Sequence, residues 1–154
     1  KTSKEALKER VISVILERKN LEKKIIDLNK KINTSNNANT ESANTVINGI
    51  KVVSKVLDTL PPKEIKGLVD EFKKELVSGI VIVISTLGNK ASLVVGVTND
   101  ISDKFDATEF TQAGVEILGG KGGGGRADMA QGGGPHYEKA EEAIEVISNL
   151  IKIK

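Results

Sequence analysis

The chain has 154 residues, of which 38% are hydrophobic and 3% aromatic, with a formal net charge of +2 and no cysteine. This length suits one ordinary domain, or a small domain plus an appended element, whose core is built from Ile, Val and Leu. The composition excludes disulfides and thiolate zinc sites. The longest apolar run, residues 80–84, is too short to span a membrane, so no membrane partner is expected. No signal peptide opens the chain, and because it begins at Lys1 rather than Met, we expect a piece of a longer protein or a processed product.

A regular spacing of apolar residues predicts one long helix, a coiled-coil-like arm, over residues 1–33. Thr2 and Glu5 can form a capping box at its start. Apolar residues then recur at alternating steps of four and three, with Arg18 in one of the slots, and such a seam would run on the order of 40 Å. The arm can pair between chains or pack on its own domain. If it pairs, giving a homodimer, the candidate oligomerisation residues are Leu7, Val11, Val14, Leu21, Ile25, Leu28 and Ile32.

Charge divides the chain in the same place. Residues 1–32 carry ten Lys and Arg against five Asp and Glu, whereas residues 33–154 carry thirteen against sixteen. The part after the arm is therefore not a generally basic nucleic-acid binder, and any phosphate contact that it makes must be local. Between the two, residues 34–45 are rich in Asn, Ser and Thr without hydrophobic periodicity, which predicts a polar linker.

Residues 46–154 have the pattern of an α/β domain, a small mixed β-sheet flanked by helices. A tight turn at Asn48-Gly49 opens a half-buried strand over 50–57, and Pro61-Pro62 starts a helix that Gly79 stops. Residues 80–84 and 91–98 predict two antiparallel strands joined by a short turn. A second helix follows the capping box of Asp106 and Glu109, and a third follows Pro135.

A glycine-rich segment, residues 119–134, is the expected functional centre. It holds nine of the fifteen glycines, and nothing in core packing is expected to require them. They suit a backbone that visits φ > 0 or approaches another molecule closely. A flexible linker remains the alternative interpretation. With two cations, and with free N–H groups beside a helix start, the segment suits a phosphate. The candidate nucleic-acid-binding residues are Gly119, Gly120, Lys121, Gly122, Gly123, Gly124, Gly125, Arg126, Asp128, Gln131, Gly132, Gly133 and Gly134.

No catalytic or metal site is expected in these 154 residues. With His136 as the one histidine and no cysteine, neither a His/Cys zinc site nor a convincing Ser–His–Asp relay can be assembled. The glycine segment is not a Walker A motif, because Lys121 precedes the four glycines and no Ser or Thr follows it. The three aspartates between residues 100 and 106 are interpreted as turn and cap residues.

The glycine segment resembles the signature of the C-terminal domain of bacterial alanyl-tRNA synthetases, whose usual form is GGKGGGRPDMAQ followed by further glycines. The residues of GGK at 119–121, Arg126 and DMAQ at 128–131 match, as do the strand SLVVGV at 92–97 and the helical PPKEIKGLVDEF at 61–72. Two departures are one extra glycine before Arg126 and Ala127 in place of proline, and the first could shift Arg126 relative to Lys121. The likeness runs from about Val46 to the end, and the 1–32 helix matches the arm that precedes this domain.

This resemblance implies a non-catalytic, tRNA-binding module of a cytoplasmic ligase that charges tRNA with alanine and edits mischarged tRNA. The module would hold the outer corner of the tRNA and, in some members, support self-association. Catalysis and editing, with ATP, magnesium and zinc as cofactors, would belong to upstream domains of the same chain. Two alternatives stay open, the substrate-binding domain of a DHH-type phosphoesterase and a pure oligomerisation module. The absence of histidine from residues 119–134 favours the synthetase branch.

Overall fold

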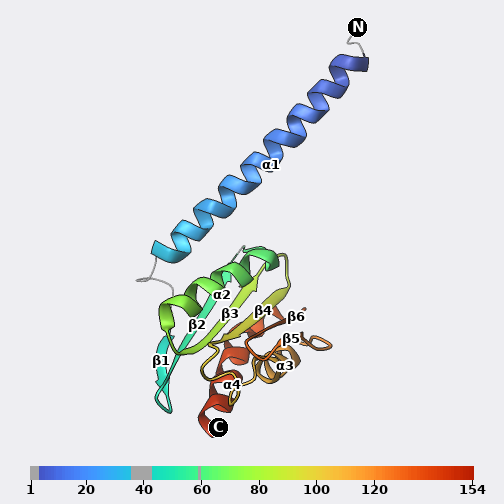
Figure 1. Ribbon diagram of the computed structural model, residues 1–154. Coiled ribbons are helices and arrows are strands. Elements are labelled where there is room, and N and C mark those ends of the chain that lie inside the picture. The colour runs from blue at the N-terminus through green and yellow to red at the C-terminus, as the bar shows by residue number, and fades with distance from the viewer. Residues whose placement is uncertain (1–3, 36–42, 59) are drawn as a thin grey trace. The chain divides into compact units, whose positions relative to one another are not determined.

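A computed structural model describes residues 4–35, 43–58 and 60–154, and within the first helix it describes the side chains of residues 8–24 and 28. The chain divides into two compact units, residues 1–38 and 39–154. The described residues of the first form helix α1 (Lys4–Ser35), so the long helix expected from the apolar spacing is confirmed (Figure 1).

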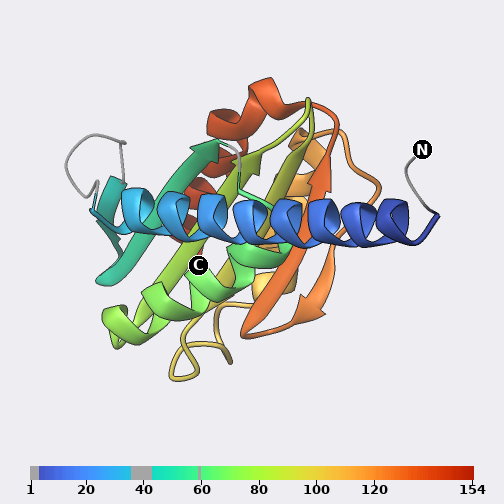
Figure 2. The same cartoon turned by 90° about the horizontal axis from the view of Figure 1, so that it is seen from above.

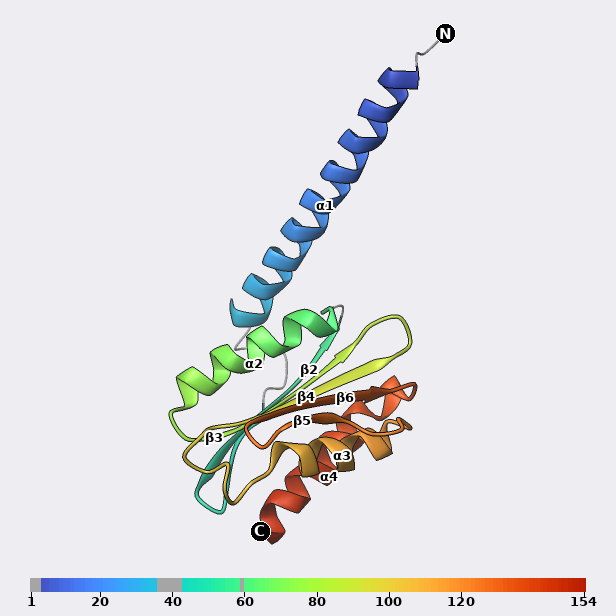
Figure 3. The same cartoon turned by 45° about the vertical axis from the view of Figure 1, so that its right-hand side comes forward.

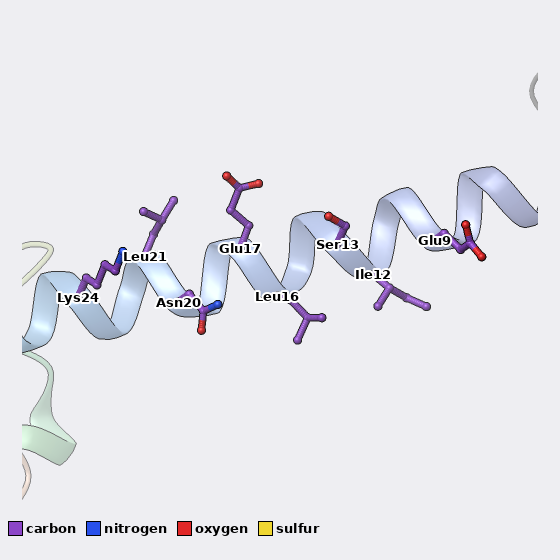
Figure 4. A pocket seen from close by; sticks show the side chains of 8 residues that line it. All are labelled: Glu9, Ile12, Ser13, Leu16, Glu17, Asn20, Leu21 and Lys24. Atoms are coloured by element: carbon purple, nitrogen blue, oxygen red, sulfur yellow. The ribbon is translucent and has the colours of Figure 1, made fainter.

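The described apolar side chains of α1 are all about half exposed. Along the expected seam the exposed fractions of Val11, Val14, Leu21 and Leu28 lie between 50% and 57%. The side chains of the other three seam residues lie outside the described set, as does the Thr2–Glu5 capping box. Apolar side chains are not confined to the seam: Ile12 and Leu16 project from the side of the helix opposite Leu21 (Figure 4).

The second unit is built on one mixed sheet. Within the described residues the sheet has six strands in the order β1-β2-β3-β4-β6-β5, and the two edges, β1 in teal and β5 in orange, are visible in Figure 2. Strands β2 and β3 run parallel, and the other neighbours are antiparallel. The strands are β1 (Ala43–Ile47), β2 (Ile50–Asp58), β3 (Gly79–Thr86), β4 (Ala91–Val97), β5 (Gly124–Arg126) and β6 (Met129–Gly134).

One expectation about this sheet is corrected. The polar linker expected over residues 34–45 is shorter at both ends, since α1 runs to Ser35 and β1 begins at Ala43; residues 36–42 lie outside the described set. Strand β1 joins the sheet because the Asn48-Gly49 turn, with φ of 51° and 82°, folds it back onto β2. Both central residues have positive φ, which is the two-residue hairpin turn that matches strand twist.

Among the described residues of this unit, helix α2 (Pro62–Leu76) covers one face of the sheet, and α3 (Ala107–Ile117) and α4 (Ala140–Ile153) cover the other (Figure 3). Helix α2 packs on β3 and β4, while α3 and α4 pack on the opposite face. The core accordingly has two aliphatic clusters, one on each side of the sheet. A short turn of 3₁₀ helix, η1 (Tyr137–Lys139), precedes α4, so the last helix begins later than Pro135 had suggested.

Strand β2 is buried on both faces rather than half buried as expected. Although Lys51 at its start is exposed, Val53, Lys55 and Leu57 on the same face are buried. Lys55 is only 4% exposed, with its ammonium 4.8 Å from the centre of the Phe72 ring of α2. Burial lowers the pKa of Lys55, and the charge of Glu75 opposes that shift. The alternating pattern does not predict this burial, because the aliphatic stem of a lysine can pack against apolar surface while its ammonium stays close to a polar or aromatic group.

The start of α3 follows the sequence closely. Asp106 is its N-cap, and its carboxylate accepts a hydrogen bond from the backbone N–H of Thr108 at 2.7 Å. Hydrogen bonds from the Thr108 side chain and backbone lower the pKa of Asp106. The expected partner in a capping box, Glu109, instead forms an ion pair with Lys154. In the described part of the chain no helix combines the length and apolarity needed to cross a bilayer.

Candidate functional site

The glycine-rich segment is not a loop but mostly a β-hairpin added to the sheet. Its two strands, β5 and β6, are antiparallel, with Arg126 opposite Met129 and Gly124 opposite Gln131. Strand β6 also pairs with β4 along its whole length, so it is an internal strand. Strand β5 covers the other side of β6 only from Met129 to Gln131, so the backbone of Gly132, Gly133 and Gly134 serves the ladder on the β4 side alone.

The first two glycines of the segment end α3. Gly119 has φ of 72°, its N–H donates to the carbonyl of Glu116 at 3.0 Å, and the N–H of Gly120 donates to the carbonyl of Val115 at 2.9 Å. This pair of bonds is a Schellman cap, in which a left-handed glycine closes the helix. The segment thus begins at the negative end of a helix dipole, which does not favour an anion there.

Most of these glycines are required by packing, so the expectation that the core does not need them is wrong. A Cβ added at Gly123 would lie 2.6 Å from the Thr111 methyl group and 2.8 Å from the Gln131 carbonyl oxygen. A Cβ at Gly134 would meet the carbonyl of Leu118. The hairpin lies so close to α3 and β4 that side chains are excluded. Similar clashes with neighbouring atoms would occur at Gly120, Gly125, Gly132 and Gly133.

Two glycines escape this constraint. At Gly122 and Gly124 an added Cβ would meet nothing within 4 Å, although Gly122 has φ of 134°. Both line a hollow of about 360 Å³ with residues of β4, β6 and the N-terminal end of α2; its members are Pro62, Ser92, Leu93, Val94, Gly122, Gly123, Gly124, Gln131, Gly132 and Gly133. Among the glycines of this hollow, Gly122 and Gly124 are therefore the two that packing leaves unexplained.

The hollow and Arg126 of the hairpin share one face of the sheet. Met129 packs against the cluster under α2, whereas Ala130 belongs to the cluster under α3 and α4. Because strand residues alternate between faces, Gln131 lies on the α2 side, and so do Gly124 and Arg126, the cross-strand partners of Gln131 and Met129. Helix α2 packs on β3 and β4 and leaves this end of the sheet uncovered.

The expected contact residues now fall into two groups. Lys121, Arg126 and Gln131 are exposed, as are the glycines from Gly122 to Gly125. Asp128 is instead tied to the protein: its carbonyl accepts hydrogen bonds from the Val97 N–H at 2.9 Å and from the Lys73 ammonium at 3.0 Å. The structure therefore brings an exposed glycine edge and two cations together, and gives Asp128 intramolecular partners.

Two residues beside the hairpin were not expected from the sequence. Lys73 reaches it from α2, which no sequence spacing could reveal, because the contact crosses 55 positions. His136 lies against Gly119, since a Cβ there would be 2.8 Å from its Nε2 atom, while its Nδ1 lies 3.2 Å from Glu138. His136 lies outside residues 119–134 in the sequence, and the chain that follows β6 brings it back beside Gly119.

In the residues that the structure describes, no group of three or more His, Cys, Asp or Glu side chains is placed to hold a metal ion. The hairpin offers donors instead: two cationic side chains, the Gln131 amide and the outer edge of β5. Such a surface suits an anion or a polar backbone held from outside.

Comparison with known proteins points in one direction. The DHHA1 domain family matches residues 49–153. The chain is 38% identical over 146 residues to the alanine–tRNA ligase of Hyphomonas neptunium and 39% identical over 153 residues to that of Parvibaculum lavamentivorans. These matches cover 95% and 97% of this chain but 17% of each relative, so the chain spans about a sixth of their length.

Solved structures resemble it as well. The crystal structure of the C-Ala domain from Aquifex aeolicus alanyl-tRNA synthetase matches with a TM-score of 0.66 and 33% identity, covering 70% of this chain and 96% of that one. A DHH-domain protein described as a member of the s1p family of ribosomal proteins matches with a TM-score of 0.54 at 17% identity, covering 87% of this chain and 32% of that one. This second likeness is one of fold.

Proposed function

We propose a function from a plain premise: this chain belongs to the DHHA1 domain family, in the branch that forms the C-terminal domain of alanyl-tRNA synthetases. We infer that the unit of residues 39–154 is a tRNA-binding module and that β5 with its flanking residues holds the RNA backbone. The parent chain would be an ATP-dependent alanine–tRNA ligase of the cytoplasm. Its ATP, magnesium and zinc would then belong to the catalytic and editing domains upstream.

The observation that carries this proposal is the exposed, side-chain-poor edge at Gly122 to Gly125 between two cations. Glycine at an exposed position that packing leaves open permits close approach of another backbone. Residues 33–154 carry more acidic than basic groups, so an RNA is not attracted to the whole surface, and Lys121 and Arg126 supply local charge. No aromatic side chain lies between residues 119 and 134, which disfavours base stacking and favours recognition of folded RNA by its shape.

The test is the loss of each cation. Lys121→Ala and Arg126→Ala are each expected to weaken tRNA binding to a similar degree for different tRNAs, because phosphate contacts position a protein without reading sequence. Each should also reduce the slope of log K against log salt by roughly one unit. Titration of tRNA at several salt concentrations measures both quantities. The control is Lys104→Ala, which removes an exposed cation from the segment between β4 and α3.

Unchanged affinity and salt slope in both variants would count against this site. Binding retained by Lys121→Ala and Arg126→Ala but lost by Lys104→Ala would move it elsewhere on the domain. A phosphodiesterase assay on the parent chain addresses the DHH-type alternative, since a synthetase module is expected to have no such activity.

We further propose that α1 supports self-association or docking on a helix of its parent chain. The supporting observation is its row of half-exposed apolar side chains, including Leu21 and Leu28. Replacing these two residues with glutamine is then expected to lower the apparent mass in light scattering, or to lower the helix content. Lys8→Gln, an exposed change on the same helix, serves as control. If mass, helicity and melting temperature all stay at the parent values, the seam is not buried.

A further inference from the structure

The Asp128 side chain lies between two cations that come from different elements. Its Oδ1 atom is 3.2 Å from Nε of Arg126, and its Oδ2 atom is 3.4 Å from Nζ of Lys73. Asp128 follows β5 in the turn of the hairpin, whereas Lys73 belongs to α2. One carboxylate therefore joins the hairpin tip to the helix on that face of the sheet.

The Lys73 side of this arrangement is rigid. Its side chain is 13% exposed, and its ammonium also donates to the Asp128 carbonyl at 3.0 Å. Its stem lies against β4 at Gly96, where an added Cβ would come within 3.0 Å of Cδ of Lys73. The carboxylate is thus held in place by a packed lysine and by the Val97 N–H, which fixes the backbone of Asp128.

The Arg126 side is open, with 83% of its side chain exposed. An exposed ion pair of this kind contributes little to folding stability, so stability gives no sufficient reason for it. Its geometry gives another reason. The carboxylate engages Nε, and the guanidinium still has both terminal nitrogens with which to form the paired hydrogen bonds that suit a phosphate.

We propose that Asp128 is a positioning residue, which aims Arg126 at an RNA phosphate and does not itself contact the RNA. The inference rests on the proposed tRNA-binding function and reverses the sequence expectation, in which Asp128 was one of the contact residues. A carboxylate near a polyanion repels it, so simple electrostatics predicts that loss of this charge tightens binding. Positioning predicts the opposite sign.

The experiment compares Asp128→Asn with Asp103→Asn in tRNA titrations of the intact chain. Asn keeps the shape of Asp and leaves the backbone bonds to Val97 and Lys73 in place, and Asp103 is an exposed aspartate in the segment between β4 and α3. Asp128→Asn is expected to weaken binding by roughly three- to tenfold, as when a charge-assisted hydrogen bond loses its geometry. Its salt slope should fall by about one unit, as for Arg126→Ala. Asp103→Asn should leave binding unchanged or slightly tighter.

Two further variants separate positioning from a general structural effect. In the Arg126→Ala background, Asp128→Asn should cause no further loss, because its action passes through Arg126. Arg126→Lys should bind tRNA as weakly as Arg126→Ala does, since a lysine cannot pair with Asp128 and at the same time offer two parallel hydrogen-bond donors to a phosphate. This variant retains Asp128, so its result does not depend on whether the fold tolerates the loss of that carboxylate.

Parent-like or tighter binding by Asp128→Asn, with Arg126→Ala weakened, would overturn the inference and leave the proposed function standing. An additional loss in the double variant would overturn it too. If the chain without substitutions does not bind tRNA, the proposed function fails, and the inference fails with it.

Discussion

Gly134→Val is expected to destabilise the second unit by about 3 kcal/mol or more, a loss that lowers its melting temperature by about 10 °C or more. Gly134 is the last residue of β6, where the chain passes the C-terminal end of α3. A Cβ there would lie 2.8 Å from the backbone nitrogen of Gly120 and nearer still to the Leu118 carbonyl oxygen. Both neighbours are backbone atoms in the Schellman cap, so no side-chain rotation relieves the clash.

Gly124→Val is the matched control, since a Cβ at Gly124 would meet nothing within 4 Å and its φ is not positive. Valine also suits a strand, so this variant should melt within about 3 °C of the parent. Thermal and urea unfolding followed by circular dichroism compare the two. If both variants melt together, the close packing of the hairpin on α3 does not carry the stability assigned to it.

The same Gly124→Val change is expected to weaken tRNA binding at least tenfold, about 1.4 kcal/mol, while leaving the fold intact. Its isopropyl group would stand on the exposed edge of the hairpin, between the protein backbone and any RNA backbone that approaches it. Gly123 cannot serve for this test, because a side chain there strikes Thr111 and would confuse unfolding with loss of binding.

The measurement is the dissociation constant for tRNA at one fixed salt concentration, with melting of each variant as a check on folding. Gly124→Ala should give an intermediate loss, because it adds a smaller group at the same point. Gly67→Ala, at an exposed glycine of α2 with open space around its Cβ, should bind as the parent does. Parent-like affinity of Gly124→Val would mean that no RNA approaches this edge closely.

The glycine segment, residues 119–134, shows what a linear sequence pattern can reveal and what it cannot. Its fixed residues pointed to the family, and that expectation is confirmed by the match of residues 49–153 to the DHHA1 domain and by the likeness to the C-Ala domain. The same residues predict a loop, because a strand of six residues with three consecutive glycines at its end has no hydrophobic alternation to reveal it. Its strand character comes from β4, which pairs with it residue by residue.

The sequence by itself determined the elements whose information is local. Apolar spacing predicted α1 and α2, the β-branched run predicted β3, and the glycine and asparagine pairs predicted the tight turns, since each depends on residues a few positions apart. The sequence also identified the protein family, through the non-glycine residues at fixed positions in the glycine segment. It did not determine which glycines serve packing and which stay open, or that Asp128 meets Lys73, because these depend on contacts between segments far apart in the chain. Tertiary structure decided them by placing the hairpin against α3 on one face and beside α2 on the other, where the space left around each Cα settles what each residue can do.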